Sequence, residues 1–159
     1  MNLRLIAVGK LKEAYLKDAA EEYKKRLSRY LKVECIEIQD ERIPDRASAA
    51  EEDTVREKEG EKILGKIGAN DFVIALCVEG KQKSSEEFAS LFSSLALSGK
   101  STVTMIIGGS LGLSEKVKGR ADLRLGVSKM TFPHQLFRVM LFEQVYRAQK
   151  ILAGETYHK

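Results

Sequence analysis

The three residues that end the chain, Tyr157, His158 and Lys159, are an aromatic residue, a histidine and a lysine, which are types that can carry chemistry. A tyrosine ring can stack on a base, a lysine can hold phosphate, and a histidine with an ordinary pKa of about 6.5 can accept a proton near neutral pH. Such a cluster is unusual at a chain end, which is commonly frayed. The tail is therefore a candidate catalytic group, with a random polar tail as the alternative.

A second candidate site is the glycine-rich run Gly108-Gly109-Ser110-Leu111-Gly112, which follows a run of apolar residues. Residues without a Cβ let the backbone approach a ligand closely, and ligands of open α/β sheets bind where strands end. The spacing is not the G-x-G-x-x-G pattern of dinucleotide-binding loops. The run predicts either a ligand-binding loop or a tight turn before a short helix capped by Ser114.

The segment Gly99-Lys100-Ser101-Thr102 looks like the end of a phosphate-binding P-loop. The first glycine of that motif would fall at Ser94, and the segment leaves a predicted helix to enter a predicted strand. A P-loop has the opposite order, because it places the N-terminus of a helix against phosphate. We therefore expect a helix that ends at a glycine, and not a nucleoside triphosphatase.

These candidates must be positioned by elements that alternate along the chain between strand and helix patterns. Apolar, β-rich runs predict strands at residues 3–8, 33–38, 71–78, 102–107 and 123–127. Helical periodicity predicts helices at residues 11–30, 48–67, 84–97 and 136–152. Capping-box patterns begin at Ser48 and Ser84. The fold class is therefore α/β, a three-layer sandwich with a mostly parallel sheet.

The last predicted helix, residues 136–152, is apolar around nearly its whole circumference. One side can pack on the sheet of its own domain, and a second copy of the protein is the natural cover for the other. Replacing Phe142 or Val145 with glutamate is expected on this basis to turn a homodimer into monomers or aggregate. The loop before the helix then lies between a sheet edge and the dimer interface, which is a favourable place for a ligand.

Length and composition limit the class of protein. At 159 residues with 43% hydrophobic content, a single domain spanning residues 1–159 is expected. The formal net charge of +4 permits nucleic-acid binding. Cys35 and Cys77 lack the spacing of a metal or redox motif, which indicates reduced core residues. No apolar run is long enough for a secretion signal or a membrane span, so we expect a cytoplasmic protein that does not contact the membrane.

Together, the segments GGSLGL, FPHQLFRVMLFEQVYRA and the terminal YHK resemble the ribosomal RNA large subunit methyltransferase H family of the SPOUT class. The similarity extends over essentially the whole chain and includes LRLIAVGK and EGEKIL. It implies a homodimeric α/β enzyme with a C-terminal trefoil knot. The implied activity is methylation of N3 of a pseudouridine in a stem-loop of 23S rRNA, with S-adenosylmethionine as methyl donor and the assembled ribosome as substrate.

The resemblance also assigns a cofactor site, for which no metal is required because the sulfonium already makes the methyl group electrophilic. Gly108→Arg is expected to abolish cofactor binding and leave the fold intact. His158 is the candidate general base, and we expect the tail to approach the methyl donor held by the other subunit. The implied cofactor-binding residues are Leu76, Gly108, Val127, Ser128, Lys129, Met130, Thr131 and Phe132.

A non-catalytic dimer that binds RNA or the ribosome is the alternative from a different class, since one fold can serve many functions. Such a protein would keep a basic surface but would not need a cofactor pocket. Calorimetric titration with S-adenosylmethionine separates the two hypotheses.

Overall fold

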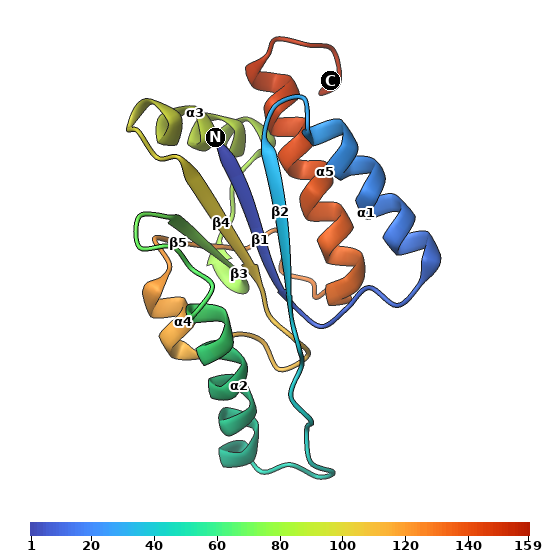
Figure 1. The fold of residues 1–159 in the computed structure, drawn as a ribbon, viewed down its shortest axis with the longest axis vertical. Coiled ribbons are helices and arrows are strands. Elements are labelled where there is room, and N and C mark those ends of the chain that lie inside the picture. The colour runs from blue at the N-terminus through green and yellow to red at the C-terminus, as the bar shows by residue number, and fades with distance from the viewer.

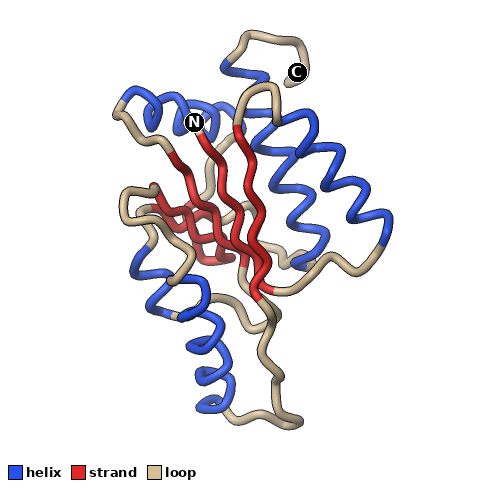
Figure 2. The backbone as a smooth tube through the Cα atoms, viewed as in Figure 1, coloured by secondary structure: helices blue, strands red, loops and turns tan.

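The computed structural model describes residues 1–159 and contains one parallel five-stranded sheet of order β2-β1-β4-β3-β5 (Figure 1). Helices cover both of its faces (Figure 2). The strands are β1 (Asn2–Val8), β2 (Lys32–Ile38), β3 (Phe72–Lys81), β4 (Thr102–Ile107) and β5 (Leu123–Leu125). The helices are α1 (Ala14–Leu27), α2 (Ala49–Leu64), α3 (Ser85–Leu97), α4 (Glu115–Arg120) and α5 (His134–Leu152). The predicted fold class is confirmed, and the trefoil knot stays a prediction.

Alternation along the strands explains the three layers. In β1, Leu3 and Leu5 point into a core shared with α1, α3 and α5, whereas Ile6 and Val8 point into a smaller core shared with α2 and α4. Successive side chains of a strand face opposite sides of the sheet, so a strand that is apolar at nearly every position must be covered twice. None of the helices combines the length and apolar character needed to cross a membrane.

Local capping signals fix where the helices begin. Ser48 accepts a hydrogen bond from the N–H of Glu51 while the Glu51 carboxylate accepts one from the N–H of Ser48, and Ser84 and Glu87 form the same pair. Both predicted capping boxes are therefore confirmed. The hydroxyl of Ser114 caps the short helix α4 in the expected place.

The segment that looks like a P-loop connects α3 to β4 at the amino end of the sheet. Gly99 has a φ of +78°, and the N–H of Lys100 donates to the carbonyl of Leu95. A glycine in the left-handed region with such a bond back into the last turn is how helices commonly end. The prediction of a glycine-terminated helix is confirmed.

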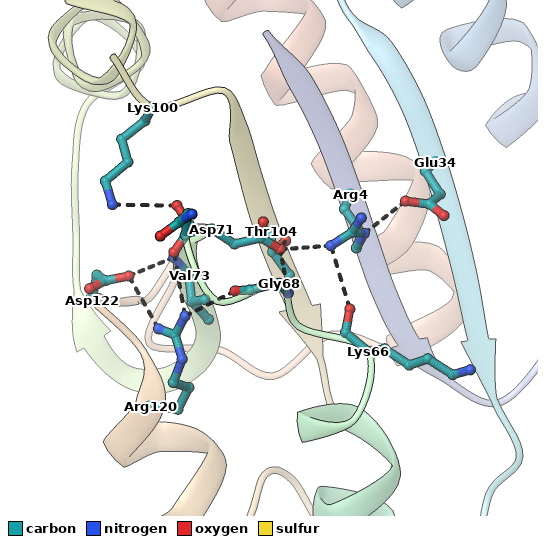
Figure 3. A network of polar contacts seen from close by, with 11 residues as sticks. Arg4, Glu34, Lys66, Gly68, Asp71, Val73, Lys100, Thr104, Arg120 and Asp122 are labelled. Atoms are coloured by element: carbon teal, nitrogen blue, oxygen red, sulfur yellow. Dashed lines mark hydrogen bonds and ion pairs between the residues drawn. The ribbon is translucent and has the colours of Figure 1, made fainter. Parts of the chain in front are cut away.

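A polar network at the same amino end joins all five strands (Figure 3). The nearly buried carboxylate of Asp71 accepts hydrogen bonds from Arg4 at 2.7 Å, from Thr104 at 2.6 Å and from the N–H of Gly68 at 2.9 Å. Arg4 also pairs with Glu34 of β2. A buried carboxylate is stable only when it is paired and hydrogen-bonded in this way. The network therefore stabilises the amino end of the sheet, which is the end opposite the glycine-rich run.

At the other end of the sheet, β3 and the chain after β5 pass one another with no room for side chains. A Cβ on Gly80 would lie 2.5 Å from the nitrogen of Gly126, and a Cβ on Gly126 would lie 2.7 Å from the carbonyl oxygen of Gly80. The pairing of β3 with β5 is interrupted between Leu76 and Lys81 at this crossing. Both glycines are therefore required by close backbone approach.

The prediction that Phe142 and Val145 lie at a dimer interface is wrong. Both belong to the larger core of their own domain, where Phe142 is 1% exposed and Val145 is 0% exposed. α5 packs between the sheet, α1 and α3, so its apolar residues are covered largely within one chain (Figure 1). Glutamate at either position would destabilise the protomer instead of separating two subunits. The outward side of α5 keeps Leu136, which is 42% exposed.

Candidate cofactor site

A cavity of about 660 Å³ lies at the carboxyl ends of β3, β4 and β5. One wall is the glycine loop, defined as residues 108–112, which follows β4. A second wall is the 126–133 loop, which leads from β5 into α5, and side chains of α2 and α4 form a third. Ligands of parallel α/β sheets bind at this edge. The cavity is therefore the candidate site.

All of the predicted cofactor-binding residues except Lys129 line this cavity. Leu76 is nearly buried at the wall, whereas Met130 is 75% exposed at the mouth. The Phe132 ring stacks on Phe137 with ring centroids 6.5 Å apart and planes 9° apart. These side chains form an apolar surface suited to a flat aromatic ring.

Gly108 is required by the glycine loop itself. A Cβ at this position would lie 2.9 Å from the carbonyl carbon of Gly112 and 3.1 Å from a methyl group of Leu113. The missing side chain therefore makes room for the turn, which closes with the N–H of Gly112 donating to the carbonyl of Gly109. Because a larger residue would displace this turn, Gly108→Arg should disturb the loop as well as any ligand. A loss of binding in this variant would therefore not separate a filled cavity from a disturbed loop, whereas the sequence alone indicated an intact fold.

The contribution of α2 to the cavity was missed by sequence analysis. Asp53, Arg56 and Glu57 lie on its wall, and the Arg56 guanidinium donates to the carbonyl of Leu111 at 3.3 Å. Arg56 is also ion-paired with Asp53. The three residues share one face of α2 by their spacing, but nothing in the spacing points to a loop more than fifty residues away.

Glu59, one turn further along α2, is buried behind the glycine loop at 5% exposure. Its carboxylate accepts a hydrogen bond of 3.0 Å from the N–H of Glu41. Burial raises the pKa of this carboxyl above its ordinary value of 4.5, and the negative charges of Asp40 and Glu41 act in the same direction. The folded state therefore binds the proton more tightly than the unfolded chain.

Replacing Glu59 with glutamine is expected to increase stability at neutral pH. The raised pKa means that protonation favours the folded state below pH 4.5, and this contribution is lost as the pH rises through the folded pKa. Glutamine carries no charge, and its side-chain oxygen can still accept the hydrogen bond from the N–H of Glu41. Thermal unfolding as a function of pH should show a gain for Glu59→Gln that shrinks as the pH falls toward 4.5. Glu57→Gln, at an exposed position, serves as the control. An equal gain in stability for Glu59→Gln at all pH values would contradict the raised pKa of Glu59.

The tail packs against the side of α5. The Tyr157 hydroxyl donates to Glu143 at 3.1 Å, and its ring lies edge-on to Tyr146 with centroids 4.9 Å apart. Burial, assisted by the Glu143 carboxylate, raises the pKa of Tyr157 to about 12, so the phenol stays neutral and remains a donor. His158 lies 2.9 Å from Glu86 and 3.3 Å from Arg147.

Within one chain, the tail and the cavity are separate. No tail residue lines the cavity, whereas α5 enters it with His134 and Phe137. The tail contacts Glu143 and Arg147, which lie roughly 9–15 Å further along the helix axis than Phe137 at 1.5 Å per residue. The candidate catalytic residues and the candidate cofactor residues are thus not brought together within a single chain.

Comparison with known proteins agrees with this geometry. The family model "Predicted SPOUT methyltransferase" matches residues 1–158. The ribosomal RNA large subunit methyltransferase H of Clostridium kluyveri is 57% identical over 159 residues, with 100% of both chains aligned. The protein of the same name from Clostridium botulinum strain Kyoto is 58% identical with the same coverage.

Two solved structures share the fold at low sequence identity. A probable methyltransferase from Bordetella pertussis Tohama I superposes with a TM-score of 0.57 at 14% identity, covering 92% of this chain and 95% of that chain. The tRNA (m1G37) methyltransferase from Aquifex aeolicus superposes with a TM-score of 0.53 at 16% identity, covering 92% of this chain and 70% of that chain. Taken with the family match and the full-length relatives, this fold shows that the chain belongs to the SPOUT methyltransferase family, among the ribosomal RNA large subunit methyltransferase H proteins.

Proposed function

We propose that the protein uses S-adenosylmethionine to methylate large-subunit ribosomal RNA. The observation that carries the proposal is the cavity at the carboxyl ends of β3, β4 and β5, which is lined by all but one of the residues assigned to the cofactor. The name of the full-length relatives supports an rRNA substrate. The finer proposal is that N3 of a pseudouridine in 23S rRNA is the acceptor, on assembled ribosomes in the cytoplasm.

The residues of the cavity fit this cofactor. Leu76, Met130 and Phe132 offer apolar contact for an adenine ring. The turn of the glycine loop brings backbone groups to the wall without intervening side chains. On the α2 and α4 side, Glu57 and Glu115 place carboxylates where a positively charged sulfonium is favoured over an anion. When bound, the cofactor supplies an electrophilic methyl group.

The protein's own part in the reaction is to position the acceptor base and remove its N3 proton. Leu76, Gly108 and Phe132 would hold the donor in the cavity, and Met130 lies exposed at the cavity mouth. The His158 imidazole is the candidate proton acceptor, and Tyr157, held neutral, can stack on or hydrogen-bond to a base. Because the tail does not reach its own cavity, we propose that a homodimer supplies it from the second subunit.

Incubation with assembled ribosomes and tritiated S-adenosylmethionine tests the proposed function directly. Label is expected in 23S rRNA from a source that lacks the modification, at a pseudouridine that becomes resistant to N3-specific reagents. Ribosome binding without calorimetric binding of S-adenosylmethionine would favour the non-catalytic, ribosome-binding alternative. The same absence of S-adenosylmethionine binding would contradict the assignment of the cavity.

Replacing Arg56 with alanine is expected to weaken S-adenosylmethionine binding without unfolding the protein. Its guanidinium holds the carbonyl of Leu111, so the variant frees the tip of the glycine loop. The loss of one such bond, about 1–1.5 kcal/mol, corresponds to about five- to tenfold in affinity by calorimetry. Arg42 is exposed and does not line the cavity, so Arg42→Ala is the matched control. Equal affinities of the two variants would show that Arg56 does not position the loop.

A further inference from the structure

The two sides of the cavity differ in charge. On the α2 and α4 side, Lys118 is paired with Glu79 at 2.6 Å and Lys116 with Glu61 at 3.2 Å, so these cations are neutralised. The acidic side chains of Asp53, Glu57, Glu79 and Glu115 also line this side. Asp53 is paired with Arg56, and Glu79 and Glu115 with Lys118, which leaves Glu57 as the carboxylate without an ion-pair partner. A polyanion approaching from here would meet more negative than free positive charge.

The α5 side carries lysines without ion-pair partners. Lys10 and Lys12 belong to the loop that follows β1, and Lys129 belongs to the 126–133 loop. All three are exposed, and none forms a salt bridge. Glu13 is the acidic neighbour at the end of the first loop, which leaves an excess of positive charge.

The loop after β1 is held against the start of α5, at the wall of the cavity. The N–H of Lys12 donates to the side chain of Gln135 at 2.9 Å. The buried guanidinium of Arg138 donates to the carbonyl of Gly9 at 3.0 Å and pairs with Glu37 at 3.4 Å. Gly9 also faces His134, which lines the cavity. The two lysines are therefore fixed beside the mouth by contacts to backbone atoms of their own loop.

We propose that Lys10, Lys12 and Lys129 contact the phosphates of the RNA and admit it to the cavity from the α5 side. This inference rests on the proposed function and adds the direction of approach and the contacting residues. Unpaired lysines on a fixed loop are suited to phosphate, because each neutralised phosphate releases a counterion. The acidic side chains on the α2 and α4 side repel the RNA phosphates, which also favours approach from the α5 side.

The test is the double variant Lys10→Gln and Lys12→Gln, compared with Lys25→Gln and Lys32→Gln. The control removes the same charge from exposed, unpaired lysines at the amino end of the sheet. Binding to protein-free large-subunit rRNA and methylation of assembled ribosomes are measured over a range of salt concentrations, and S-adenosylmethionine binding is measured by calorimetry.

The Lys10 and Lys12 variant is expected to bind RNA on the order of tenfold more weakly, with a salt dependence shallower by about 1.5–2 in logarithmic slope. Its affinity for S-adenosylmethionine should not change, and the control should bind RNA like the parent. Equal RNA binding and slope for both variants would overturn the inference. So would a variant that binds bare rRNA normally yet methylates assembled ribosomes poorly, since its lysines would then contact a ribosomal protein. A parent protein that binds and methylates no rRNA would instead contradict the proposed function.

Discussion

Two chains that are each inactive are expected to restore methylation when their subunits exchange. One chain carries Val127→Arg and Met130→Arg, which place positive charge and bulk at the cofactor cavity while keeping the tail. Both positions are exposed, so the core should tolerate the change. The other chain ends after Glu155, which retains the hydrogen bonds of that carboxylate with Tyr30 and Lys150 but removes the tail.

The physical reason is the separation of the tail from the cavity within one chain. If the tail acts on the partner's cavity, each heterodimer contains one complete site, and random exchange gives about a quarter of the parent activity. Each variant alone should transfer methyl groups at least about 10²- to 10⁴-fold more slowly than the parent. That range is the usual contribution of a positioned acid–base group to the rate. The readout is tritium incorporation after exchange, with heterodimers counted by two affinity tags.

The truncated chain alone should still bind S-adenosylmethionine, because none of its missing residues lines the cavity. Confirmed heterodimers without recovered activity would contradict action between subunits. Full activity of the truncated chain would show that the tail has no part in the reaction. His158→Gln, made in the full-length chain, then distinguishes a base from a positioning group, since only a base would change the pH dependence of the rate.

Gly80→Ala is expected to destabilise the protein and abolish cofactor binding together. A Cβ at Gly80 would lie 2.5 Å from the nitrogen of Gly126 and 2.8 Å from that of Leu125, and backbone atoms cannot move aside as a flexible side chain can. Overpacking of this kind costs about 1–3 kcal/mol or more, and each kcal/mol lowers the Tm of a chain of this size by about 2–4 °C. Since Gly126 directly precedes Val127, which lines the cavity, displacement of the backbone at Gly126 also changes the shape of the cofactor cavity.

Gly119→Ala provides the matched control, because a Cβ there meets nothing within 4 Å. Gly119 lies inside α4, where alanine favours the helix, so this variant should be as stable as the parent or slightly more stable. Thermal unfolding and calorimetric titration of the same preparations give the comparison. A Gly80→Ala protein with parental Tm and affinity would show that the crossing of β3 with the chain after β5 can relax.

Much of the fold was predictable from local patterns. Alternation of strand and helix signals gave the α/β class, the two capping boxes marked the starts of α2 and α3, and the continuous apolar run at 71–78 indicated a strand covered twice. These features depend on neighbours within a few residues, which is why they can be read in order along the chain. The cofactor residues came from resemblance to a family, and the glycine loop by itself left a plain turn as the alternative.

Contacts between distant segments were decided only by tertiary structure. An apolar circumference shows that α5 must be covered, but the amino-acid pattern does not say by what, and Phe142 and Val145 proved to lie in their own domain's core. Likewise, the strand order β4-β3-β5 creates the crossing at Gly80 and Gly126, and brings Arg56 of α2 to the glycine loop. The sequence by itself determined which elements form and which faces are apolar, since both follow from local geometry. Which faces meet was settled by packing, because it depends on how segments far apart in the chain share one core.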